Sequence, residues 1–279
     1  MLRARARRHG RDGRMNPTPL QARLMAAALL LILLGLWELV VRQSGLSTLV
    51  LPAPSAVAAA LWTGLASGYF WPHIAATLQA LVLGLAAGSL VGLFAGMALA
   101  ESALLEGVLK PYVVVSQVVP KLALAPLFVL WFGFGLLPTV LITALICFFP
   151  LMENTLTGLR QVDAQRLQLF RMLGATRLQT LLRLKLPMGL PAILAGLRVA
   201  VVLALVGVVV AEFMGASRGL GAVVIAAQGM MDTTLMFAAL VIIAAIGLLL
   251  YQCCILLERR LLRSHAFSVL STARLRANP

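Results

Sequence analysis

Residues 74–100, IAATLQALVLGLAAGSLVGLFAGMALA, form a run of 27 positions without a charged side chain. About 20 apolar residues in a helix are enough to cross the hydrocarbon core of a bilayer. Within the run, Gly84, Gly88, Gly92 and Gly96 recur every four residues and therefore fall on one face of such a helix. Small residues at this spacing let two helix backbones approach closely in lipid. The run predicts a membrane-spanning helix with a packing face.

The rest of the chain has the same apolar character. Of its 279 residues, 61% are hydrophobic and 11% are charged, against roughly 45–50% and about 25% in an average globular chain. This composition excludes an ordinary soluble fold. Five further segments are long enough to predict spans, namely residues 24–41, 111–131, 138–157, 190–212 and 235–257. We predict an all-α, polytopic membrane protein whose transmembrane domain, residues 24–257, has about six helices.

The positive charge of the chain predicts how it is oriented. The 23 Lys and Arg outnumber the 9 Asp and Glu and give a formal net charge of +14. A nucleic-acid partner is not expected, because the cations are spread over separate loops and no soluble basic domain holds them. Cytoplasmic loops retain Lys and Arg, and six spans with the N-terminus inside place 19 of the 23 cations there. Both basic tails, residues 1–23 and 258–279, are then cytoplasmic.

The segment 158–189, GLRQVDAQRLQLFRMLGATRLQTLLRLKLPMG, is the most distinctive of the predicted cytoplasmic loops. Asp163 is a favourable N-cap for a short helix over residues 164–173. Gly174 is suited to end that helix in a left-handed turn. The first helix carries an apolar stripe of Leu167, Phe170 and Leu173. An exposed apolar stripe in a cytoplasmic loop needs a partner, either lipid headgroups or another protein.

A second helix is predicted to follow at once. Thr176 and Gln179 have the spacing of a capping box, in which each side chain bonds the backbone of the other residue. We expect Leu186-Pro187 to close this helix. The loop is therefore predicted as helix, tight turn, helix.

These residues carry a resemblance to a known family. Gly174, nine intervening residues, Leu184 and then Leu186-Pro187 resemble the EAA loop of the membrane subunits of binding-protein-dependent ABC importers. The similarity extends over about residues 20–262 and points to the nitrate, sulfonate and taurine branch. It is carried by LPAPSAVAAAL (51–61), PKLALAPLFVLWFG (120–133), GLPAILAGLRVA (189–200), VVAEFMGASRGLG (209–221) and LLERRLL (256–262).

The resemblance implies a multi-pass permease subunit of the bacterial inner (plasma) membrane. In that family, two permease subunits, here expected as a homodimer, work with cytoplasmic ATPase subunits. A periplasmic or lipid-anchored binding protein delivers the solute. The short helix of the loop docks into a groove of the ATPase and couples hydrolysis to transport. The implied coupling residues are Asp163, Leu167, Gln168, Phe170, Gly174, Thr176, Leu184, Leu186 and Pro187.

The sequence departs from the family pattern at one place. Gln168-Leu169-Phe170 stands where the family has Glu-Ala-Ala, so an acidic residue is missing and two small residues are replaced by large ones. We expect the loop to keep its fold and to present a more apolar interface centred on Phe170.

No enzymatic site is expected in this chain. A P-loop requires Gly-Lys followed by Ser or Thr, but the three lysines follow Leu109, Pro120 and Leu184. ATP is then bound by a partner subunit, and no cofactor is expected here. Hydrolase and metalloprotease motifs are absent from the sequence, and its three Cys and three His are scattered, so we predict neither catalysis nor a metal site.

Polar residues inside predicted spans are candidates for the solute path. Lys121, Gln117 four positions before it, and Gln79 in residues 74–100 are the candidates. The alternatives are a snorkelling lysine at a kink and a glutamine that bonds across helices. Glu212 is expected to order the outer loop together with Arg218 rather than to touch the solute.

The identity of the solute stays open at this point. A sulfonate, taurine or nitrate fits the branch, but residues 116–135 and 147–150 also resemble importers of thiamine pyrimidine precursors or riboflavin. The alternative of another class is a secondary carrier or channel that needs no ATPase. Such a carrier should show internal repeats and several intramembrane charges, and the sequence has no clear repeat.

Overall fold

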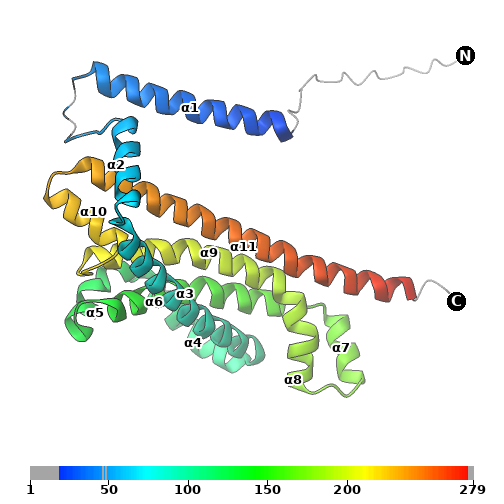
Figure 1. The fold of residues 1–279 in the computed structure, drawn as a ribbon. Helices are drawn as coiled ribbons and strands as arrows, with labels where there is room; N and C mark the ends of the chain where they lie inside the picture. The colour runs from blue at the N-terminus through cyan, green and yellow to red at the C-terminus, as the bar shows by residue number, and fades with distance from the viewer. Residues whose placement is uncertain (1–18, 46, 48, 276–279) are drawn as a thin grey trace, which may run out of the picture.

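The computed structural model describes residues 19–45, 47 and 49–275, and all regular elements within this part are helical (Figure 1). Five helices are long and apolar enough to span a membrane, and a bent helix pair brings the number to six if the pair counts as one span. The prediction of an all-α fold with about six spans is confirmed. Residues 1–18 and 276–279 of the predicted tails lie outside the described residues.

Three long helices, α3 (Phe70–Glu101), α6 (Leu136–Arg160) and α9 (Leu186–Phe213), form the centre of the bundle. All four glycines of the packing face on α3 are buried. A methyl group on Gly88 would collide with the backbone of Ala144, and one on Gly96 would lie 2.6 Å from the carbonyl oxygen of Met152. The glycine face of α3 thus lies directly against the backbone of α6.

The contact between α6 and α9 is equally close. Gly158 and Gly189 face each other, so that a methyl group on either would press on the backbone of the other. Small and apolar side chains fill the space where the three helices meet, and those buried there are Ala80, Leu81, Cys147, Ala200, Ala204 and Val208. This rigid centre positions the loops at both ends of the bundle.

The helix α1 (Pro19–Gln43) stands apart from this centre (Figure 1). Its Glu38 carboxylate accepts hydrogen bonds from the backbone N–H and the hydroxyl of Ser55, at 3.0 and 2.7 Å. Ser55 lies in the first turn of α2 (Pro54–Ala66), where backbone N–H groups lack partners within the helix. The Arg42 guanidinium forms an ion pair with the same carboxylate at 2.7 Å. One carboxylate therefore caps α2 and fixes it to α1.

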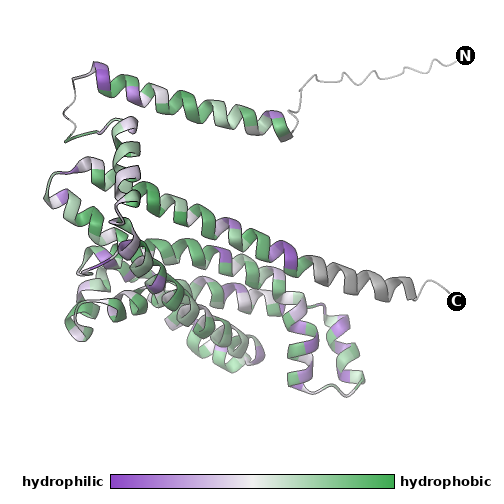
Figure 2. Cartoon of the chain, in the orientation of Figure 1, coloured by the Kyte–Doolittle hydropathy of each residue, from purple (hydrophilic) through white to green (hydrophobic). Residues whose placement is uncertain are grey.

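The remaining helices complete the outer layer of the bundle. The short helix α10 (Leu220–Gly229) follows α9, and α11 (Thr233–Leu275) is a single helix that continues well past residue 257. Both pack with α2 around buried Phe70, Leu220 and Val223. Figure 2 shows the apolar character of these helices along the bundle.

The predicted span over residues 111–131 is not one continuous helix. The chain forms α4 (Ala103–Val118), a 3₁₀ turn η1 (Lys121–Leu124) and α5 (Ala125–Phe132), and the two arms are bent by 81°. Pro120 explains the break, because it lacks an N–H and disfavours helical geometry at the residue before it. Val119 is accordingly extended, with φ −67° and ψ 123°.

The prediction that Leu186-Pro187 closes a helix is also wrong. The short helix α8 (Arg177–Thr180), the π-helical segment η2 (Leu181–Lys185) and α9 follow without a break, and one candidate span runs over Arg177–Phe213. A π-helical segment shifts hydrogen bonding by one residue and lets a helix accommodate an irregularity. It directly precedes Pro187 here, so the proline begins a stretch of α-helix instead of ending one.

Candidate coupling loop and outer pocket

The predicted cytoplasmic loop forms a helical hairpin at one end of the bundle (Figure 1). Its first helix, α7 (Ala164–Met172), begins at Asp163, whose carboxylate accepts the N–H of Gln165 at 3.2 Å. Gly174 has φ +69°, and the N–H of Ala175 donates to the carbonyl of Phe170 at 3.0 Å. The N-cap and the left-handed turn are both confirmed.

The second helix of the hairpin begins with the predicted capping box. The N–H of Gln179 donates to the Thr176 hydroxyl at 3.2 Å, and the N–H of Thr176 donates to the Gln179 side chain at 2.9 Å. The turn between α7 and α8 is thus fixed from both sides by local hydrogen bonds. Polar and apolar residues alternate over the hairpin, in contrast to the spans (Figure 2).

The apolar surface of the hairpin differs from the predicted stripe. Leu167 and Phe170 are half-buried, whereas Leu169, Met172 and Leu173 are exposed, the last two by 85% and 73%. These three residues have the i, i+3, i+4 spacing of one helix face, and we call them the tip patch. Of the predicted stripe, only Leu173 belongs to the tip patch.

The other predicted loop residues lie nearer the bundle or on the polar side of α7. Gln168 is exposed, Leu184 is buried, and Leu186 and Pro187 are half-buried where the chain enters α9. The ammonium group of Lys185 lies 2.6 Å from the Glu101 carboxylate at the end of α3, and both side chains are largely shielded from solvent. This ion pair fixes the base of the hairpin to α3. Nothing in the sequence pointed to it, because the two residues are 84 positions apart.

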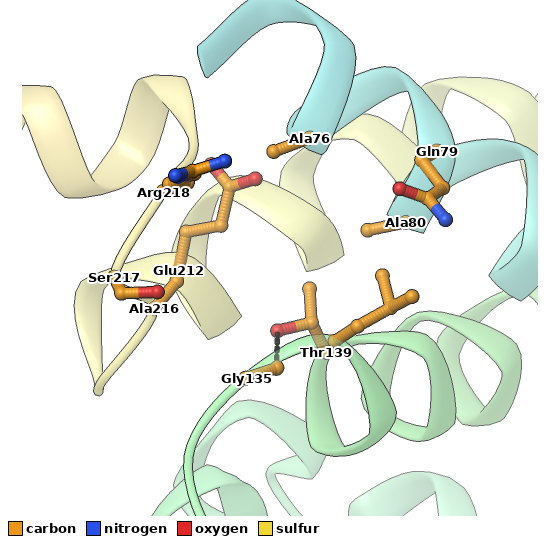
Figure 3. Close-up of a pocket in the computed structure, with 10 residues that line it drawn as sticks. Ala76, Gln79, Ala80, Gly135, Thr139, Glu212, Ala216, Ser217 and Arg218 are labelled. Carbon is orange, nitrogen blue, oxygen red and sulfur yellow. Dashed lines mark hydrogen bonds between the residues drawn. The ribbon is translucent and has the colours of Figure 1, made fainter. Parts of the chain in front are cut away.

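A small polar pocket lies at the opposite end of the bundle (Figure 3). It encloses about 160 Å³ between α3, α6 and the segment after α9. Gln79 faces it from α3 and Thr139 from α6, while Glu212, Ser217 and Arg218 line the other side. The pocket therefore brings Gln79 close to residues that the sequence assigned to the outer loop.

Glu212 organises the loop beside this pocket. Only 3% of the residue is exposed, and its carboxylate accepts hydrogen bonds from the Thr77 hydroxyl at 2.8 Å and from the Gly221 N–H at 2.7 Å. Thr77 in turn accepts the N–H of Leu220 at 2.8 Å. Arg218, which was expected to order the outer loop together with Glu212, forms no ion pair with it in the described structure. The N–H groups at the start of α10 supply the donors instead.

Thr77→Val should loosen this outer loop. The change removes a donor from Glu212 and an acceptor from Leu220, and each buried polar group left without a partner costs about 1–3 kcal/mol. We expect a lower melting temperature of the purified protein in detergent. Thr63→Val is the matched control, because Thr63 is exposed on α2. Equal melting temperatures for the two variants would contradict the role given to Thr77.

The predicted solute-path residues do not meet in one cavity. Gln79 lines the outer pocket, whereas the Lys121 ammonium lies 5.5 Å from the centre of the Phe149 ring on α6. Gln117 is exposed near the end of α4. Both Gln117 and Lys121 lie beside the bend at Pro120, Gln117 exposed and Lys121 half-buried.

Comparison with known proteins identifies the class of this fold. The solved structure of the methionine ABC transporter MetNI in an inward-facing conformation contains a chain that is similar with a TM-score of 0.62 at 17% identity. The match covers 70% of this chain and 98% of that one. At this level of identity the likeness establishes the fold alone.

Sequence comparison gives the family. The family described as the binding-protein-dependent transport system inner membrane component matches residues 88–263. The riboflavin transport permease RibX of Chloroflexus aurantiacus is 40% identical, over 85% of this chain and 88% of its own length. The taurine permease TauC of Escherichia coli is 36% identical over 85% and 88%. The formylaminopyrimidine permease ThiX of Halalkalibacterium halodurans is 36% identical over 78% and 87%.

The chain belongs to this family of inner-membrane importer components. It is a multi-pass membrane permease, and its family consists of transport components and not of enzymes. The resemblance found in the sequence is thereby confirmed. The family description also names the kind of system in which such a component works, one that depends on a binding protein.

Proposed function

We propose that this chain is the permease of an ABC importer and that its tip patch docks on a cytoplasmic ATPase subunit. The observation that carries the proposal is the exposure of Leu169, Met172 and Leu173 on a rigid hairpin. Apolar residues of this size, on a surface that projects into water, indicate a protein contact. Phe170, which follows Leu169 in α7, is half-buried.

The polar residues of α7 support the same contact. Gln168 carries no charge, and the hairpin holds several arginines but only one carboxylate, that of Asp163. Asp163 caps α7 and is thus occupied within the hairpin. We infer that the ATPase groove for this loop is apolar at its centre and neutral or acidic at its rim.

We further propose that two copies of the chain form the solute path. Gln117, exposed on α4, and Lys121, half-buried in η1, interrupt the apolar face around the bend, and polar groups that face lipid are costly. The bend at Pro120 also frees backbone carbonyls, which at membrane depth face protein or a water-filled cavity. A second copy against this face would enclose both residues in a path between the subunits.

The solute that we propose is a small sulfonate of the taurine type, delivered by an extracytoplasmic binding protein. Arg218 supports it, because it lines the outer pocket and forms no ion pair within the described structure, while the Glu212 carboxylate in the same pocket is bound by Thr77 and Gly221. The pocket, at about 160 Å³, suits a sulfonate group. Riboflavin or a pyrimidine precursor is the second candidate, and the 40% identity to RibX favours it.

A thermal-shift screen of the cognate binding protein decides between the two candidates. Taurine, a longer alkanesulfonate, riboflavin and a formylaminopyrimidine are added separately, and a ligand that binds only the folded protein raises its melting temperature. The proposal expects the sulfonates to raise the melting temperature and the two heteroaromatic compounds to leave it unchanged. The opposite pattern would assign the importer to the second candidate.

A further inference from the structure

A basic cavity lies behind the coupling hairpin, between the hairpin and the end of α3. It encloses about 460 Å³ and is lined by three cations, Arg171, Arg177 and Lys185, and by one carboxylate, Glu101. Arg171 comes from the last turn of α7 and Arg177 from the first turn of α8. The cavity is thus formed where the two helices of the hairpin and the bundle meet.

The charges in this cavity do not balance. Lys185 and Glu101 neutralise each other through their 2.6 Å ion pair. Arg171 and Arg177 form no ion pair within the described structure, whereas Arg160 and Arg198 pair with Glu106 and Glu258. Other arginines near this end of the bundle therefore have carboxylate partners, whereas Arg171 and Arg177 leave two unpaired positive charges at one cavity.

The depth of the cavity indicates what neutralises them. The candidate span of α3 ends at Glu101, and that of α9 begins at Arg177. Both residues line the cavity, so the cavity lies where these two candidate spans end. Basic pockets between helices on the cytoplasmic side are suited to phosphate-bearing lipid headgroups. Leu167 adds an apolar wall toward the bundle.

We propose that this cavity binds a phosphate group and that its source is the headgroup of an anionic phospholipid. The guanidinium groups of Arg171 and Arg177 offer the planar donor pairs that match phosphate oxygens. A phosphate held by both arginines bridges α7 to α8 beside the ion pair at the base of the hairpin. The lipid then stiffens the hairpin that presents the tip patch.

The test measures lipid retention by the purified permease, so it requires neither the ATPase nor transport. The chain is incubated with phosphatidylglycerol in phosphatidylcholine nanodiscs, and bound lipid is counted by native mass spectrometry. The variant is Arg171→Gln with Arg177→Gln. Its matched control, Arg166→Gln with Arg183→Gln, removes two charges from the same loop but none from the cavity. A third variant, Arg171→Lys with Arg177→Lys, keeps both positive charges and shows whether substitution at these two positions disturbs folding.

We expect the Arg171 and Arg177 glutamine variant to bind phosphatidylglycerol about thirtyfold more weakly than the wild type. Each basic residue near an anionic surface contributes a factor of roughly five in affinity, and two such factors multiply. The control and the lysine variant should retain most of the binding. Equal losses in both glutamine variants would overturn the site. A parallel sample receives inorganic phosphate, and phosphate bound by the wild type without a difference in lipid retention between the variants would overturn the lipid as the source. Unchanged retention of phosphatidylglycerol by the Arg171 and Arg177 glutamine variant would also overturn the site.

Discussion

Met172→Asp combined with Leu173→Asp should reduce ATP-driven uptake to the background level. Both side chains belong to the most exposed part of the tip patch. Docking on an apolar groove would bury two unpaired carboxylates, and an uncompensated buried charge costs several kcal/mol. The complex with the ATPase should then dissociate during purification. Uptake into proteoliposomes and co-purification of the ATPase measure the two effects.

The matched control for this variant is Leu104→Asp. Leu104 is as exposed as the tip patch but lies in the first turn of α4, where a carboxylate is favourable near the helix N-terminus. The Leu104→Asp variant should co-purify with the ATPase as the wild type does. If the tip-patch variant also kept its ATPase and its uptake, the hairpin would not be the docking element.

Gly88→Leu should prevent the permease from folding into a stable bundle. A methyl group at Gly88 already collides with the backbone of Ala144, and this backbone cannot move aside as a side chain would. Overpacking of a well-packed core costs about 1–3 kcal/mol even for smaller insertions, so a leucine should separate α3 from α6. We expect almost no monodisperse protein after extraction in mild detergent.

Gly35→Leu provides the comparison for this change. Gly35 also lies in an apolar span, but no atom lies within 4 Å of where its side chain would extend. This variant should be extracted in the same amount as the wild type and melt at a similar temperature. Similar yields for Gly88→Leu and Gly35→Leu would show that the glycine face does not hold α3 against α6.

The sequence predicted the features that depend on local chemistry. The length of apolar runs predicted the spans, and Asp163, Gly174 and Thr176 predicted the hairpin, because caps and left-handed turns need particular residues at particular positions. Proline was less informative. Pro120 breaks a span and Pro187 does not, and the difference lies in the π-helical segment before Pro187.

Features that depend on distant residues were not predictable in this way. The spacing of the glycines on α3 indicated a packing face, but nothing in it identified α6 as the partner. The pair of Lys185 with Glu101 and the bond from Thr77 to Glu212 join residues that only the folded bundle brings together. The outer pocket and the basic cavity depend on such contacts, and so they became visible only in the structure.

Uptake of radiolabelled solute into proteoliposomes tests the central claim most directly. The permease is reconstituted with its cognate binding protein, with and without the ATPase subunits, and ATP is enclosed on the ATPase side. An importer permease should accumulate solute only when the ATPase, ATP and the binding protein are all present. Accumulation by the permease alone, without ATPase subunits, would contradict the account and show that the chain is a self-sufficient carrier.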